Sequence, residues 1–155
     1  MDKEKVETLA CKSALYYYGK ACNYDEESEA LGYKGPSTAA RALARIFQND
    51  RKNRVILDIG GGTDSYDAVL GVSIICSLQP GFMCSDIKEM IRLAKPGGII
   101  LMILRTETLY YHFFKDKLIP FFDELQSEEK WKQLERSQFK YMYGVEGQLF
   151  VYQKL

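Results

Sequence analysis

The stretch Val55-Ile56-Leu57-Asp58-Ile59-Gly60-Gly61-Gly62-Thr63 decides how the rest of the chain is interpreted. Apolar, mostly β-branched residues lead to Asp58, and three glycines follow, a pattern typical of a buried strand that runs into a nucleotide-binding loop. Such a loop normally opens a helix, whose N-terminal amides point at the ligand. Here the chain continues directly into residues 65–70, which read as another strand. The sequence therefore predicts the strand and glycine loop of a cofactor site without the helix.

Length and composition indicate one folded domain over residues 1–155. Hydrophobic residues make up 46% and charged residues 27%, as in ordinary globular proteins. Twenty-one basic residues balance twenty-one acidic ones, so no broad field favours nucleic acid or anionic lipid as a partner. The apolar runs are too short to cross a bilayer, and the N-terminus has no apolar signal core. We expect a cytoplasmic protein without nucleic-acid or membrane partners.

The four cysteines contain no CxxC pair, and His112 is the sole histidine that could join them in a metal site. Free thiols and no metal site are therefore expected. His112 could act as a base or orient an acceptor, because imidazole titrates near neutrality, but a structural histidine is the commoner case. No catalytic residue is assigned.

Hydrophobic periodicity predicts alternating strands and helices. Residues 1–30 read as helical, and Pro36 suits the first turn of a helix that should pack on the sheet. Ser127 could cap a short helix that carries Trp131 and Leu134. The other predicted elements are strands at 55–59, 68–75 and 99–104, helices over 85–94 and 113–125, and a hairpin of 138–143 with 149–153. This order predicts an α/β fold, a three-layer αβα sandwich with a mixed sheet.

Three motifs in this order resemble class I S-adenosylmethionine-dependent methyltransferases: Asp58-x-Gly60-x-Gly62-Thr63, Tyr66-Asp67-Ala68-Val69 and Leu93-x-Lys95-Pro96-Gly97-Gly98. Four further segments resemble the methyltransferase-like protein 27 (Williams-Beuren region 27) family over nearly the whole chain. These are Tyr24-Asp25, Gly32-Tyr33-Lys34-Gly35-Pro36, Arg105-Thr106 and Glu128-Glu129-Lys130-Trp131.

The resemblance implies a Rossmann-like sheet of strand order 3-2-1-4-5-7-6 with strand 7 antiparallel. Residues 55–59, 68–75 and 99–104 then correspond to strands 1, 4 and 5, and the tail supplies strands 6 and 7. The helix after strand 1 and strands 2 and 3 are missing, about 50 residues. Because Thr63-Asp64-Ser65 is too short for a parallel crossover, strand 1 should pair antiparallel with strand 4 or be displaced. An open sheet edge, and self-association through it, would follow.

The resemblance also implies S-adenosyl-L-methionine as the cofactor and an acceptor of unknown kind, a small molecule or a protein. It implies that the methionine portion faces Asp58, Gly60, Gly61, Gly62 and Thr63, with Gly71 lining the same crevice. Tyr24 could belong to a lid, although aromatic residues on a helix more often pack in a core. The residues that hold ribose and adenine after strands 2 and 3 have no counterpart. Two hypotheses stay open: a methyltransferase with an impaired cofactor site, and a catalytically silent form that acts through protein contacts, its glycines a simple turn.

Overall fold

Five strands form one mixed sheet in the order β1-β2-β3-β5-β4. β1, β2 and β3 are parallel, and β5 runs antiparallel to both β3 and β4. In the family numbering this is the order 1-4-5-7-6 with an antiparallel strand 7. The resemblance implied the neighbours 4-5-7-6, whereas strand 1 was expected to pair as a hairpin or to be displaced. The strands are β1 Ile56–Asp58, β2 Tyr66–Val72, β3 Ala94–Arg105, β4 Trp131–Met142 and β5 Val145–Lys154.

The computed structural model describes residues 23–58, 66–73, 83–111 and 114–155. The chain divides into two compact units, residues 1–33 and 34–155. In the first unit, the helix α2 spans Tyr24–Ala30 and has no buried residue. The second unit contains the whole sheet. The expectation of one domain over residues 1–155 stays a prediction.

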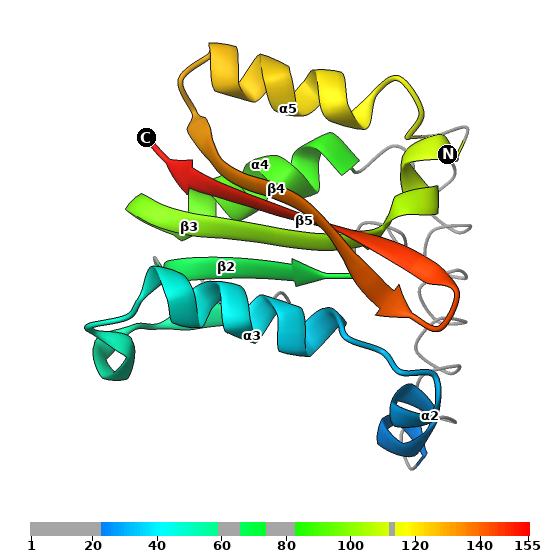
Figure 1. The fold of residues 1–155 in the computed structure, drawn as a ribbon. Coiled ribbons are helices and arrows are strands. Elements are labelled where there is room, and N and C mark those ends of the chain that lie inside the picture. The colour runs from blue at the N-terminus through cyan, green and yellow to red at the C-terminus, as the bar shows by residue number, and fades with distance from the viewer. Residues whose placement is uncertain (1–22, 59–65, 74–82, 112–113) are drawn as a thin grey trace, which may run out of the picture. The chain divides into compact units, whose positions relative to one another are not determined.

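Helices cover both faces of the sheet, which confirms the αβα sandwich (Figure 1). α3, Gly35–Ile46, begins with Pro36 in its first turn and packs on β2 and β3 from one side. α4, Met83–Leu93, and α5, Leu118–Ser127, lie on the other side. The described residues of this unit also form the short 3-10 helices η1 at Arg51–Asn53 and η3 at Thr106–Tyr110.

The larger core lies between the sheet and the α4/α5 layer. Phe122 of α5 is at its centre, with edge-to-face contacts to Trp131, Phe150 and Tyr152 at ring-centroid distances of 5.4–5.6 Å. Trp131 also stacks on Tyr152 at 3.9 Å and donates its indole N–H to the Phe122 carbonyl at 3.2 Å. These contacts hold β4 and β5 against α5.

The structure corrects the predicted pairing of the first two strands. β1 lies parallel to β2, with Ile56 beside Ala68 and Asp58 beside Leu70. The expectation of a hairpin or a displaced strand is wrong because β1 has only three residues. The connection must return from the level of Leu70 to that of Tyr66, about 13 Å along the strand, and cross about 4.8 Å to the neighbour. The seven residues 59–65 can reach about 23–25 Å, so they suffice without a helix.

The predicted helix from Ser127 is also wrong. α5 ends there, and Glu129 adopts a left-handed conformation with φ 56°. The N–H of Lys130 bonds to the Leu125 carbonyl at 3.0 Å, and that of Glu129 to the Gln126 carbonyl at 3.1 Å. These two bonds form a Schellman motif, which ends a helix and turns the chain. Trp131 therefore begins β4 and is fully buried in the core, as an anchor of a strand and not of a helix.

Among the described strands, β1 and β4 are the two edges of the sheet. Before and within β1, Val55 and Ile56 expose 53% and 43% of their surface, high values for apolar residues beside a sheet. Among the described residues, no helix has the length and hydrophobicity that a membrane crossing requires.

Candidate functional site: the carboxyl ends of the parallel strands

Ligands of open α/β sheets bind outside the carboxyl ends of the parallel strands, so a ligand site is expected at these ends. Asp58 ends β1 there and is exposed. Gly71 lies inside β2, buried and paired with Met102 of β3. Tyr24 is 44% exposed and belongs to the first unit. Gly60, Gly61, Gly62, Thr63 and His112 lie outside the described residues. The described part of the chain thus places two predicted residues at or next to the carboxyl ends of the parallel strands: Asp58 ends β1, and Gly71 is the second-last residue of β2.

Asp67 holds β1 in its parallel position. Its Oδ2 accepts the backbone N–H of Val55 at 2.9 Å, and its own backbone N–H donates to the Val55 carbonyl at 2.9 Å. The same carboxylate pairs with Arg54 at 3.0 Å and with Lys95 at 3.3 Å. Asp67 is the second residue of β2.

These contacts lower the pKa of Asp67 below its ordinary value of 3.8, chiefly through the hydrogen bond from the Val55 amide and then through Arg54 and Lys95. Its side chain is only 12% exposed, and burial opposes the shift. Asp67 is therefore ionised at neutral pH and acts as a structural anion between β1, β2 and the start of β3.

A polar cluster lies at the carboxyl ends of β2 and β3. Ser73 follows β2 in a left-handed conformation with φ 62°, and its hydroxyl hydrogen-bonds to the Tyr141 hydroxyl. The guanidinium carbon of Arg105, at the end of β3, lies 5.7 Å from the centroid of the Tyr141 ring. Arg105 also pairs with Glu107 at 3.2 Å.

Tyr141 belongs to β4, two strands away from β3 in the sheet, and a glycine allows it to cross. A Cβ on Gly147 of β5 would lie 2.8 Å from the Phe139 ring and 3.1 Å from Cβ of Tyr141. Gly147 is paired with both Arg105 and Phe139. Without a side chain at Gly147, the Tyr141 ring can pass over β5 toward Arg105 and Ser73.

Thr106, directly after β3, has a buried Oγ1 without a hydrogen-bond partner among the described residues. A buried hydroxyl without a partner loses the hydrogen bonds it would make in water, so it favours a bound molecule that supplies one. Together with Ser73, Arg105 and Tyr141, it gives this edge donors, acceptors and one cation. Such groups can orient a polar ligand.

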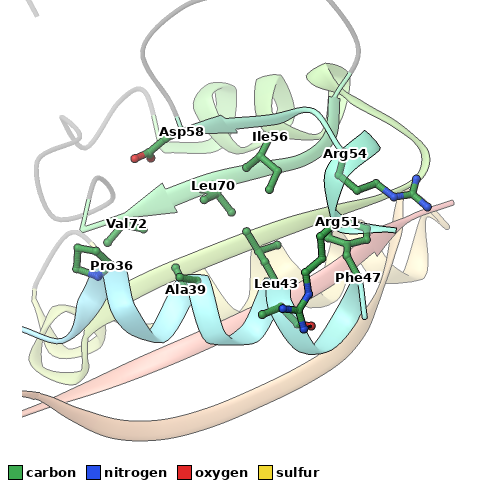
Figure 2. A pocket seen from close by; sticks show the side chains of 12 residues that line it. Pro36, Ala39, Leu43, Phe47, Arg51, Arg54, Ile56, Asp58, Leu70 and Val72 are labelled. Atoms are coloured by element: carbon green, nitrogen blue, oxygen red, sulfur yellow. Dashed lines mark hydrogen bonds between the residues drawn. The ribbon is translucent and has the colours of Figure 1, made fainter. Parts of the chain in front are cut away.

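A groove lies beside α3, on the sheet face that this helix covers only in part (Figure 2). Its volume is about 380 Å³, and its walls are mostly apolar. Ile56 of β1 and Leu70 and Val72 of β2 point toward α3 across it. Asp58 lies at one end of the groove, and Arg51 and Arg54 at the other.

Both arginines at the groove already have partners. Arg51 donates to the Ala44 carbonyl at 2.8 Å, and Arg54 pairs with Asp50 at 3.2 Å and lies over the Phe47 ring at 5.1 Å. No described residue forms a hydrogen bond or ion pair with Asp58. The groove therefore has one unpaired charge in its described lining, the Asp58 carboxylate.

Sequence reasoning missed Ser73, Tyr141 and the groove. Ser73 follows an apolar run without any motif, and Tyr141 is one of eleven tyrosines. The pair Arg105-Thr106 was noted for resemblance alone, and its position at the carboxyl end of β3 now gives it a structural context. Among the described residues, no group of three or more His, Cys, Asp or Glu could hold a metal ion.

The described residues fit one part of S-adenosylmethionine better than the other. Asp58 and the unpartnered Thr106 hydroxyl lie at the carboxyl edge, where the polar methionine portion would be held. β1 is the sheet edge, so no described strand stands beyond it to carry an acid for the ribose hydroxyls or a group that reads adenine. The fit is therefore limited to the amino-acid portion.

No protein-family model matches the chain, and no curated protein is significantly similar to it. Among solved structures, the N-methyltransferase NodS from Bradyrhizobium japonicum WM9 is similar at 15% identity, with a TM-score of 0.46, over 62% of this chain and 55% of that one. The NodS complex with S-adenosyl-L-homocysteine has 16% identity, a TM-score of 0.47, and coverage of 74% and 62%.

A further similar structure is the Burkholderia thailandensis 1,6-didemethyltoxoflavin-N1-methyltransferase, at 11% identity, a TM-score of 0.44, and coverage of 62% and 47%. The chain thus spans between about half and three fifths of the length of these proteins. At these sequence identities and TM-scores, similarity to the solved structures supports no conclusion about the activity of this chain. The fold assignment rests on the strand order of the chain itself, and the similar structures named here are methyltransferases.

Proposed function

We propose that this chain is a shortened S-adenosylmethionine-dependent methyltransferase domain that keeps the methionine half of the cofactor site. The observation that carries the proposal is the parallel pairing of β1 with β2, which keeps Asp58 at the carboxyl edge beside the end of β2. A hairpin would have turned these ends apart. The glycine motif after Asp58 and the strand order 1-4-5-7-6 support the same assignment.

The finer assignment is to the methyltransferase-like protein 27 family, with strands 2 and 3 and their helices lost after the first glycine motif. It is supported by the ordered sequence segments and by a sheet that begins at strand 1. The acceptor is a small molecule or a protein, since balanced charge gives no reason to expect nucleic acid. We place the protein in the cytoplasm, on its sequence alone.

When bound, S-adenosylmethionine supplies an activated methyl group to a nucleophile. Methyl transfer depends on alignment of donor and acceptor in a site that excludes water, so an additional base is not required. The chain's contribution is positional: Asp58 would fix the amino-acid portion, while Ser73, Arg105 and Tyr141 present polar groups at the neighbouring strand ends.

Calorimetric titration with S-adenosylhomocysteine, homocysteine and adenosine tests whether the chain holds the amino-acid portion of the cofactor and not the adenosine portion. We expect saturable heat with S-adenosylhomocysteine and weaker heat with homocysteine, and none with adenosine alone. Asp58→Asn should weaken S-adenosylhomocysteine binding about tenfold, the loss of ~1.4 kcal/mol for one charged contact. Asp123→Asn is the matched control, because Asp123 is an exposed carboxylate on α5, on the opposite side of the sheet. Absence of saturable binding at millimolar S-adenosylhomocysteine would reject the proposal.

The second candidate is a catalytically silent form that acts through protein contacts. It is favoured by the open β1 edge and by the lack of described groups for ribose and adenine. Transfer of labelled methyl from S-adenosylmethionine to an acceptor in a cell extract would reject this candidate. The acceptor assay therefore separates the two functions even where both forms bind the cofactor.

A further inference from the structure

The open edge of β1 is defined by the direction of its backbone groups. The Val55 carbonyl points at β2, where it accepts the Asp67 N–H at 2.9 Å. Successive residues of a strand turn their backbone groups to opposite sides, so Ile56 and Asp58 turn theirs away from β2. Arg54 has extended backbone angles, φ −88° and ψ 130°, and continues this strand geometry by two residues. Residues 54–58 are thus a five-residue edge without a described neighbour strand on the outer side.

The side chains of this edge alternate between the two faces of the sheet, with Ile56 at the centre. Arg54, Ile56 and Asp58 all line the groove on the α3 face. Val55 and Leu57 point to the other face, where Leu57 packs against the larger core. The groove face of the edge therefore carries a cation, an apolar residue and an anion in chain order. The other face carries two apolar residues.

We propose that β1 pairs antiparallel with β1 of a second copy of this chain, about a two-fold axis at Ile56. In this register Ile56 meets Ile56, and their outward N–H and C=O groups exchange two hydrogen bonds. Arg54 of each copy lies opposite Asp58 of the other, so that Asp58 joins the carboxylates of Asp50 and Asp67 that already pair with Arg54 in each single chain. On the other face, Val55 lies opposite Leu57. All five positions are complementary to the same five positions of the other copy.

Neighbouring registers do not have this property. A shift of two residues in pairing, to a two-fold axis at Leu57, would place Ile56 opposite Asp58. An axis at Val55 would place Arg54 opposite Ile56. Both would put a charged group against an apolar one, and odd shifts would mismatch the backbone groups. The charge pattern therefore favours the register centred on Ile56, and it favours a second copy of this chain as the partner.

The proposed pairing of residues 54–58 from two copies, called the seam below, also accounts for exposed apolar surface. Val55 and Ile56 are 53% and 43% exposed in the single chain, and pairing would cover both. An apolar edge strand without lysine or proline is a template for pairing, which natural proteins usually block. Because a five-residue seam is smaller than the standard interface of about 1,600 Å², we expect a weak dimer that depends on concentration.

Sedimentation velocity of the full chain, without cofactor, from micromolar to millimolar concentration tests the dimer. The wild type should shift from monomer to dimer. Ile56→Lys puts two ammonium groups on the two-fold axis and should weaken dimerisation at least about tenfold. Leu134→Lys is the matched control, because Leu134 is 46% exposed on β4, the opposite edge, and this variant should dimerise like the wild type. A wild type that stays monomeric throughout, or an unchanged Ile56→Lys variant, would overturn the proposal.

Two charge-reversal variants test the register centred on Ile56. Asp58→Arg gives two arginine pairs across the seam, and Arg54→Asp gives two carboxylate pairs, so each variant alone should be monomeric. Mixed together, they should form a heterodimer, because each introduced charge then meets its opposite. Since Arg54 also binds Asp50 and Asp67, circular dichroism must show that Arg54→Asp is folded. If it is not, Asp58→Arg alone decides, and wild-type dimerisation by that variant would overturn the register.

Discussion

The backbone N–H of Val55 and the carboxylate of Asp67 meet at 2.9 Å, while the Asp67 N–H donates back to the Val55 carbonyl at the same distance. This reciprocal pair fixes a three-residue strand, β1, to the sheet. A strand this short has few ladder hydrogen bonds, so one ionised side chain contributes a large share of its attachment. The position of the candidate cofactor site therefore depends on Asp67.

Asp67→Asn should destabilise the fold near neutral pH and have little effect in acid. The pKa of Asp67 is lowered in the folded state, so its stabilisation is complete above the ordinary value of 3.8 and is lost as the pH falls through the folded value. We expect a loss of about 1.5–3 kcal/mol at neutral pH, the range for hydrogen bonds to a charged group. Urea denaturation of both proteins at a series of pH values measures it. A difference that stays constant down to strongly acid pH would contradict the assignment.

Ala44→Leu on α3 should be tolerated or mildly stabilising, because Ala44 lines the groove and the larger side chain has space to fill. Ala42→Leu on the same helix should cost about 1–3 kcal/mol, since Ala42 is only 2% exposed and added methyl groups would strain the packing. Both changes are equal in chemistry and helix propensity, so their difference in unfolding free energy reports the groove itself. Equal losses would mean that the groove is closed in solution.

Gly147→Ala should destabilise the β4–β5 hairpin by about 1–3 kcal/mol, because the new Cβ would lie 2.8 Å from the Phe139 ring. Gly144→Ala serves as comparison: its φ of 71° penalises alanine by about 1–2 kcal/mol, but no atom lies within 4 Å of the new Cβ. Adding Tyr141→Phe to Gly147→Ala and to Gly144→Ala separates the steric effect of the new Cβ from the cost of a positive φ. In a double-mutant cycle, Tyr141→Phe should couple to Gly147→Ala and not to Gly144→Ala.

Glu129→Gly should stabilise the protein by about 0.5–1 kcal/mol, because Glu129 occupies a left-handed position, φ 56°, that glycine adopts without strain. Glu128→Gly is the control, since Glu128 has φ −79° and gains nothing from glycine. Thermal denaturation followed by the fluorescence of Trp131, the one tryptophan of the chain, compares the two variants. A melting temperature for Glu129→Gly no higher than that of the wild type would contradict the Schellman motif.

Much of the fold could be predicted from local pattern. The helix after Pro36, the helix that contains Ile87 and Met90, and the continuous apolar strand around Ile99 all form as expected, since each has a clear period and clear ends. Prediction failed where a local pattern competed with a non-local partner. The spacing of Trp131 and Leu134 fits a helix, but pairing with β5 and the Schellman motif before Trp131 make this segment a strand.

Of the candidate site, the sequence predicted Asp58 at the end of a strand but not the groups around it. Ser73 follows β2, Arg105 ends β3 and Tyr141 lies in β4, and they meet because Gly147 leaves space for the tyrosine ring. The spacing of these residues in the sequence does not predict that they lie close together, since their proximity depends on the order and twist of the strands.

By itself, the sequence determined most of the strands and helices and, through the resemblance of its motifs, that β2, β3, β5 and β4 are neighbours, because apolar period and motif order are properties of the chain. Tertiary structure alone decided that β1 lies parallel to β2. Chain length permitted this pairing only because β1 is three residues long, and the contacts of Asp67 with Val55, Arg54 and Lys95 hold the strand there. The same tertiary placement leaves residues 54–58 as an edge whose alternating cation, apolar residue and anion gain meaning only beside another strand.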